Sequence, residues 1–146
     1  MKAADSGPLV IDASVALAWM MPDEDVPGIE AVLNAVVARG AFAPCIWPLE
    51  VANALLAAMR RGRLTPPQRK TALAALGDLA VRIDEAAPSL AWTTYSEIAD
   101  DLQLTVYDAA YLELALRKGM PLATLDKALR RAAVSAGAGL FALESP

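Results

Sequence analysis

The chain has 146 residues and a formal net charge of −4, and 56% of its residues are hydrophobic. This hydrophobic share lies above the roughly 45–50% of ordinary soluble domains and excludes a disordered chain. The length favours a single domain over residues 1–146. No apolar run reaches the roughly 18–20 residues that a membrane span requires, and Asp12 interrupts the only apolar stretch that could serve as a signal peptide. There is no histidine, and Cys45 is the only cysteine. These two facts exclude Ser-His-Asp and Cys-His hydrolases, structural zinc sites and intramolecular disulfides. Because disulfides belong to oxidising compartments, we expect a cytoplasmic protein.

Short apolar segments alternate with helical ones along the chain. In the first part the pattern predicts a strand at 9–11, helices at 14–20 and 26–38, a strand at 41–43, helices at 48–61 and 66–79, and a strand at 80–83. It continues with a helix at 88–102, a strand at 104–106, a helix at 108–118, a strand at 121–125, a helix at 126–133 and a strand at 139–143. This alternation predicts an α/β fold, with a central parallel sheet of about four to five short strands flanked by helices and more helix than strand.

Three acids follow predicted strands, and each begins a helix: Asp12, Asp108 and Asp126. Because the carboxyl ends of parallel strands share one edge of a sheet, we expect these side chains to lie near one another. Aspartate is also a favoured residue at a helix N-cap, and for any one of the three that structural role is the commoner interpretation.

Glu50 and Asn53 are the only polar residues between Leu49 and Met59, and their spacing of three places both on one helix face. An unpaired carboxylate would be costly to bury on that face, which favours a functional site. The alternative is that Glu50 lies in the first helical turn after Pro48 and only interacts favourably with the helix dipole.

Several carboxylates drawn together need a cation, because two of them about 6 Å apart repel by roughly 3 kcal/mol at an effective dielectric constant of about 20. With no histidine and no cysteine nearby, an all-oxygen site selects Mg²⁺, with Mn²⁺ as the second choice. Such a site suits the hydrolysis of phosphodiester bonds, in which the cation activates water and neutralises charge on the phosphate.

Four segments carry these acids and come in a defined order: Val10–Trp19 (VIDASVALAW), Pro48–Leu55 (PLEVANAL), Leu104–Leu112 (LTVYDAAYL) and Pro121–Leu129 (PLATLDKAL). In this order they resemble the motifs of the PIN-domain ribonucleases, and closely those of the VapC-type toxins of bacterial toxin–antitoxin pairs. The resemblance covers nearly the whole chain, although residues 65–87 match only in their helix–strand pattern. It implies a single PIN-like domain.

The resemblance implies a quartet of acids around Mg²⁺: Asp12, Glu50, Asp108 and Asp126. Of these, Asp12 and Asp108 would be direct ligands, and the other two would act through water or a second ion. Ser14 and Thr124 match the family's small hydroxyl positions, although helix capping or strand-end hydrogen bonding explains them equally well. The implied protein is a Mg²⁺-dependent endoribonuclease, the toxin of a type II pair, which forms a homodimer and binds a cognate antitoxin.

Basic residues gather at 60–70 and at 117–131, despite the acidic total. A nuclease needs cations to hold phosphates. We therefore expect RNA contacts from arginines of both groups, namely Arg60, Arg61, Arg63, Arg130 and Arg131. The alternative is a solvated surface on which arginines near helix C-termini favour the dipole.

Two other functions remain open. A haloacid-dehalogenase-like phosphatase also begins with a strand that ends in Asp, but it requires a second Asp two residues later, where this chain has Ser14. A non-catalytic α/β partner-binding domain needs none of the acids. The position of the acids separates the three functions, because a phosphatase would leave Glu50 remote and a binding domain could scatter all four.

Overall fold

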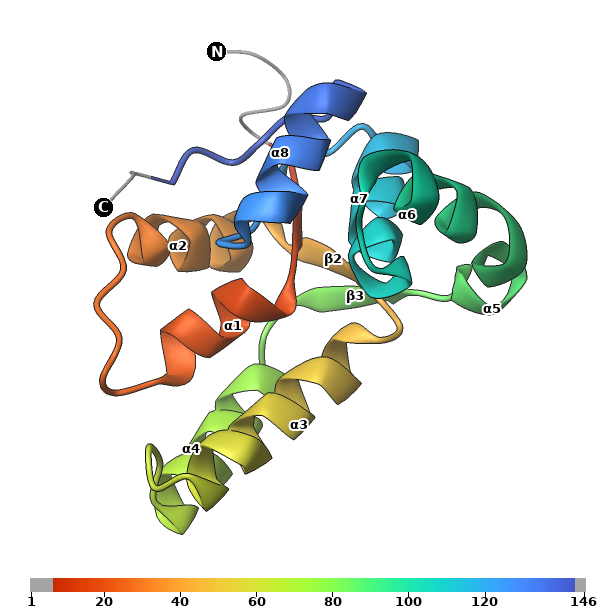
Figure 1. Ribbon diagram of the computed structural model, residues 1–146. Coiled ribbons are helices and arrows are strands. Elements are labelled where there is room, and N and C mark those ends of the chain that lie inside the picture. Colours follow the sequence, from red (N-terminus) through yellow and green to blue (C-terminus); the bar gives the residue numbers. More distant parts are fainter. Residues whose placement is uncertain (1–6, 144–146) are drawn as a thin grey trace.

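The computed structural model describes residues 7–143, in which four strands form one parallel sheet in the order β3-β2-β1-β4 (Figure 1). The strands are β1 (Leu9–Ile11), β2 (Ala41–Pro44), β3 (Val81–Asp84) and β4 (Leu122–Ala123). β1 pairs in parallel with both β2 and β4, and its three residues are completely buried. The predicted α/β fold is confirmed, and the strand that leads to Asp12 lies inside the sheet.

Helices cover the sheet and form the rest of the regular structure. They are α1 (Ala13–Met20), α2 (Ile29–Arg39), α3 (Trp47–Arg60), α4 (Pro66–Gly77), α5 (Ala87–Leu90), the π-helical segment η2 (Ala91–Tyr95), α6 (Ser96–Leu102), α7 (Val106–Lys118) and α8 (Lys127–Ala136). α7 packs across β1 and β2 and also against α6 and η2, so its residues 109–115 are all buried. α3 and α4 pair with each other and extend away from the sheet (Figure 1). Within this described part of the chain, no helix is long and apolar enough to cross a membrane.

The strand predicted at 104–106 does not form. Gln103 takes the left-handed conformation (φ 57°) that ends α6, and Thr105 caps α7 by accepting a hydrogen bond from the backbone N–H of Asp108 at 3.0 Å. The apolar run is thus a tight connection between two helices, because a threonine at the cap position outweighs a β-branched pattern of only three residues. Asp108 consequently lies in the first turn of α7 and does not follow a strand.

Two further elements differ from the prediction. The strand expected at 139–143 is reduced to one parallel bridge between Leu140 and Leu122, because β4 ends after two residues, where the chain turns towards α8. The helix expected at 88–102 is continuous but contains the π-helical segment η2, where Ser96 Oγ donates to the backbone oxygen of Ala91. The remaining predicted elements form with their ends displaced by at most about three residues.

Candidate active site

Asp12 stands at the carboxyl end of β1. It is the N-cap of α1, where its Oδ1 accepts a hydrogen bond from the backbone N–H of Val15 at 3.2 Å. Trp47 Nε1 donates to its backbone oxygen at 3.2 Å, which joins the start of α3 to this end of the sheet. Only 5% of Asp12 is exposed. The residue is therefore a cap, but a buried one, and capping alone does not require burial.

Two hydroxyls hold the Asp12 carboxylate. Ser14 Oγ donates to Oδ1 at 2.6 Å, and Thr124 Oγ1 donates to Oδ2. Each hydroxyl also accepts a backbone N–H at 3.0 Å: Leu125 donates to Ser14, and Asp126 donates to Thr124. These bonds tie the end of β4 to the end of β1 and give the carboxylate one orientation.

Burial makes the ionised form of Asp12 costly. Desolvation raises the pKa of Asp12 from 3.8 to about 6, against the hydrogen bonds that favour the carboxylate, and the charge of Asp108 raises it further. No arginine or lysine among residues 7–143 forms an ion pair with Asp12. A buried carboxylate without a cationic partner in the described part of the chain is suited to bind a cation from outside.

Asp108 lies in the first turn of α7, where it is half-buried. Desolvation raises its pKa, and the charges of Asp126 and Glu50 raise it further. Together with the effect of Asp108 on Asp12, these interactions link all four predicted acids electrostatically.

Glu50 lies in the first turn of α3, as the dipole interpretation requires, but it also has a specific partner. The hydroxyl of Tyr111 donates to Glu50 Oε1 at 2.6 Å. Tyr111 is buried, and burial together with the hydrogen bond and charge of Glu50 raises the pKa of this phenol, so that it remains a donor. Sequence reasoning missed Tyr111, although its spacing of three residues from Asp108 places it on the same face of α7.

Asp126 is the N-cap of α8, and its Oδ1 accepts the backbone N–H of Leu129 at 2.8 Å. Its side chain is exposed, unlike that of Asp12. The capping interpretation is therefore correct for Asp12 and Asp126 and wrong for Asp108, whose helix is capped by Thr105.

The four acids, and the two hydroxyls that donate to Asp12, carry only oxygen donor atoms, which Mg²⁺ and Mn²⁺ prefer. As the side chains stand, no three acidic or cysteine side chains between residues 7 and 143 surround a common metal position. Metal ligation by the quartet therefore stays a prediction, and the uncompensated charge of the acids is the observation that fits it.

Three other predicted residues lie close to these elements. Asn53 is exposed on α3, one turn after Glu50. Arg130 and Arg131 lie on α8, within the first two turns after its Asp126 cap. Their contact with RNA stays a prediction, but their helix starts at the candidate site.

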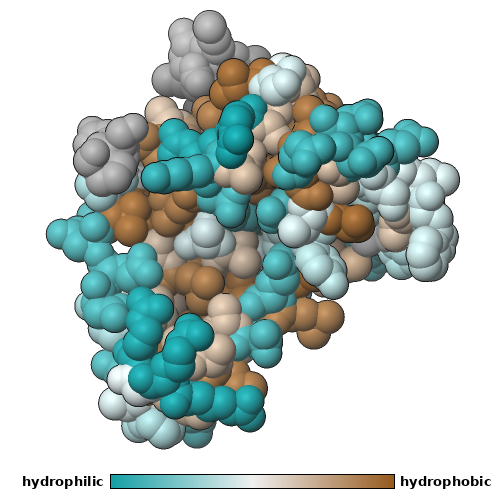
Figure 2. All heavy atoms as spheres, in the orientation of Figure 1, coloured by the Kyte–Doolittle hydropathy of each residue, from teal (hydrophilic) through white to brown (hydrophobic). Residues whose placement is uncertain are grey.

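The arginines Arg60, Arg61 and Arg63 lie at the opposite end of α3, about 15 Å along the helix from its acidic end. Arg63 forms exposed ion pairs with Asp23 at 3.2 Å and Glu24 at 3.3 Å. Hydrophilic side chains gather at this lower tip of the molecule, over the ends of α3 and α4 (Figure 2). An RNA contact here would be remote from the acids.

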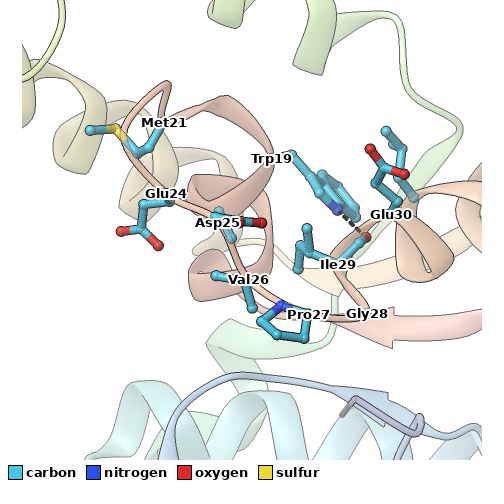
Figure 3. A pocket seen from close by; sticks show the side chains of 11 residues that line it. Trp19, Met21, Glu24, Asp25, Val26, Pro27, Gly28, Ile29 and Glu30 are labelled. Atoms are coloured by element: carbon cyan, nitrogen blue, oxygen red, sulfur yellow. Dashed lines mark hydrogen bonds between the residues drawn. The ribbon is translucent and has the colours of Figure 1, made fainter. Parts of the chain in front are cut away.

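A cavity of about 510 Å³ opens between α1, α2 and the loop that joins them (Figure 3). Trp19 lines it and holds the loop, because its Nε1 donates to the backbone oxygen of Ile29 at 3.1 Å. The lining mixes apolar side chains with the acids Glu24, Asp25 and Glu30 and includes none of the predicted quartet. This cavity is separate from the candidate active site.

The family model of the PIN domain matches residues 9–135. No curated protein sequence matches the chain. PAE2754 from Pyrobaculum aerophilum is 21% identical, with a TM-score of 0.65 over 89% of this chain and 87% of that one. FitAcB from Neisseria gonorrhoeae is 14% identical, with a TM-score of 0.63 over 92% of this chain and 96% of that one. VapC20 of Mycobacterium tuberculosis, a sarcin–ricin loop cleaving toxin, is 14% identical, with a TM-score of 0.60 over 85% of this chain and 94% of that one. At these identities the likeness to solved structures shows the fold.

Proposed function

The chain belongs to the PIN domain family, and on this premise we propose that it is the toxin of a type II toxin–antitoxin pair, an endoribonuclease that hydrolyses RNA phosphodiester bonds with Mg²⁺ or Mn²⁺. The observation that carries this proposal is a set of four interacting acids, in which the charge of Asp108 acts on Asp12 and those of Glu50 and Asp126 act on Asp108. Asp12 is moreover a buried carboxylate with no cationic partner among residues 7–143. The fold shared with VapC20, a sarcin–ricin loop cleaving toxin, supports RNA as the substrate.

The resemblance of the four segments to the PIN motifs suggests a role for each acid. Asp12 and Asp108 would hold the cation directly, and Glu50 and Asp126 would hold its water molecules or a second ion. When bound, the cation supplies neutralising charge at the phosphate and makes a nearby water more acidic. The two hydroxyls that donate to Asp12 keep its carboxylate in one orientation, which leaves the remaining lone pairs pointing in fixed directions.

The two alternatives have less support. A haloacid-dehalogenase-like phosphatase needs an aspartate two residues after Asp12, where Ser14 instead donates a hydrogen bond to it. That enzyme would also leave Glu50 apart, whereas the charge of Glu50 acts on Asp108. A partner-binding domain has no need for uncompensated acids that act on one another.

A toxin of this type has partners and a location. We expect a homodimer, a cognate antitoxin and a cytoplasmic RNA target. Exposed apolar side chains next to the acids, Leu49 beside Glu50 and Tyr107 beside Asp108, offer surface for such contacts. Light scattering of the purified chain tests the dimer, and a monomer at micromolar concentration would remove it from the proposal.

Cleavage of RNA by the purified chain tests the function. We expect cleavage that requires Mg²⁺ or Mn²⁺, stops in EDTA and leaves 5′-phosphate and 3′-hydroxyl ends, because attack by water breaks the bond to the 3′ oxygen and needs no 2′-hydroxyl. Asp108→Asn protein prepared in the same way controls for contaminating ribonuclease. Cyclic phosphate ends or full activity in EDTA would contradict the mechanism. Sequencing RNA ends after brief expression without the antitoxin would identify the target.

A further inference from the structure

Tyr111 connects the core of the protein to the candidate active site. Its ring belongs to the main hydrophobic core, and only 1% of the residue is exposed. Its hydroxyl leaves that core to meet Glu50 Oε1 at 2.6 Å, although the two residues are 61 positions apart in the chain. The short distance marks a charge-assisted hydrogen bond between a phenol and a carboxylate.

Tyr95 provides a comparison within the same molecule. It is also buried, with 2% of its surface exposed, and it packs against α7 from the other side through Ala109 and Ala110. Its hydroxyl is buried without a hydrogen-bond partner in the described residues. Burial of a tyrosine in this fold therefore does not by itself bring the hydroxyl to an acid. The contact between Tyr111 and Glu50 is a specific one.

We propose that Tyr111 is a positioning residue for Glu50, an inference that rests on the proposed metal-dependent nuclease function. A free glutamate side chain samples many rotamers, and ordering it costs entropy whenever it must hold a cation or its water. The Tyr111 hydroxyl occupies Oε1 and fixes the carboxylate before any cation arrives, so Oε2 is left to make that contact. Tyr111 follows Asp108 by three residues on α7, so one helix supplies an acid and also orients a second acid on α3.

The test compares four proteins: wild type, Tyr111→Phe, Tyr95→Phe and Glu50→Gln. Calorimetric titration with Mn²⁺ measures metal affinity directly, and RNA cleavage across Mn²⁺ concentrations gives the half-saturating concentration. Loss of a group that orients a metal ligand typically weakens affinity or activity by about 10–100-fold. We expect a loss in this range for Tyr111→Phe and a change of less than about twofold for Tyr95→Phe, which also removes a buried tyrosine hydroxyl.

The double variant Tyr111→Phe/Glu50→Gln separates positioning from a general structural effect. If Tyr111 acts through the Glu50 carboxylate, the phenylalanine should change Mn²⁺ affinity by less than about twofold once Glu50 is an amide. Thermal melting without metal checks that each variant folds. A Tyr111→Phe protein with wild-type Mn²⁺ affinity and half-saturation would overturn the positioning role while leaving the nuclease intact. Wild-type protein that neither binds Mn²⁺ nor cleaves RNA would overturn the proposed function, and the positioning role with it.

Discussion

Replacement of Asp12 by asparagine should make the metal-free protein more stable at neutral pH. The asparagine oxygen can still accept the capping hydrogen bond from Val15, but the charge that burial disfavours is gone. With the pKa raised from 3.8 to about 6, and each pKa unit corresponding to about 1.4 kcal/mol, ionised Asp12 lowers the free energy of unfolding by about 3 kcal/mol. In the variant, Thr124 can no longer donate to residue 12 and must instead accept a hydrogen bond from the asparagine amide, which offsets about 1 kcal/mol of this gain in stability. We therefore expect a net gain of about 2 kcal/mol.

The pH dependence of this gain follows from the direction of the shift. The pKa of Asp12 is higher in the folded protein than in the unfolded chain. The wild-type protein therefore has its full free energy of unfolding while Asp12 is protonated, below about pH 3.8, and loses about 3 kcal/mol of it as the pH rises through about 6. The Asp12→Asn variant lacks this titration. The two proteins should therefore differ little near pH 4 and most above about pH 7.

Urea unfolding in EDTA, at a series of pH values from about 4.5 to 8, measures the difference. Asp23→Asn is the matched control, because Asp23 is exposed and the hydrogen bond from Arg63 lowers its pKa. Its charge favours the folded state, so its replacement should not stabilise the protein at any pH. Parallel pH profiles of wild type and Asp12→Asn, or a variant less stable than wild type above pH 7, would refute the reasoning.

Three further predictions concern the other acids and the cap that places one of them. Asp108→Asn should abolish RNA cleavage and leave the circular dichroism spectrum unchanged, and wild-type turnover would contradict its role as a ligand. Asp126→Asn keeps a good N-cap but removes a charge that acts on Asp108. Its melting temperature without metal should therefore equal or exceed that of wild type. Mg²⁺ at ten times its dissociation constant should stabilise wild type by about 1.4 kcal/mol and the variant by less. Thr105→Ala should lower the free energy of unfolding by about 1 kcal/mol through loss of the α7 cap, and an unchanged urea midpoint would argue against the cap.

The parts of the site that follow local rules could be predicted from the sequence. A buried apolar strand closed by an aspartate is recognisable without knowledge of its neighbours, and Asp12 and Asp126 both stand after strands as expected. The parallel sheet then requires the two strand ends to meet at one edge. The strand expected before Asp108 is wrong, because Asp108 stands in the first turn of a helix that follows another helix.

The remaining parts depend on contacts that no local pattern encodes. Three apolar or β-branched residues at 104–106 fit a strand and a helix–helix connection equally well by pattern, and the packing of α6 against α7 favours the connection that the Thr105 cap allows. The pairing of Tyr111 with Glu50 depends on how α7 crosses the sheet relative to α3. Whether the acids close around a metal depends on rotamers, which the order of residues in a chain does not determine.

The pairing of β1 with β4 has a consequence for synthesis of the protein. The hydrogen bond between Thr124 and Asp12 spans 112 positions, so a ribosome delivers one half of this contact long before the other. Until the last strand emerges, β1 has an open edge, and the Asp12 carboxylate lacks the hydroxyl that holds it from that side. Pairings between residues so distant in the chain are slow to form, because closing the long loop between them costs entropy. The edge of the sheet that carries Asp12 is therefore complete only after residues 122–124 have been synthesised.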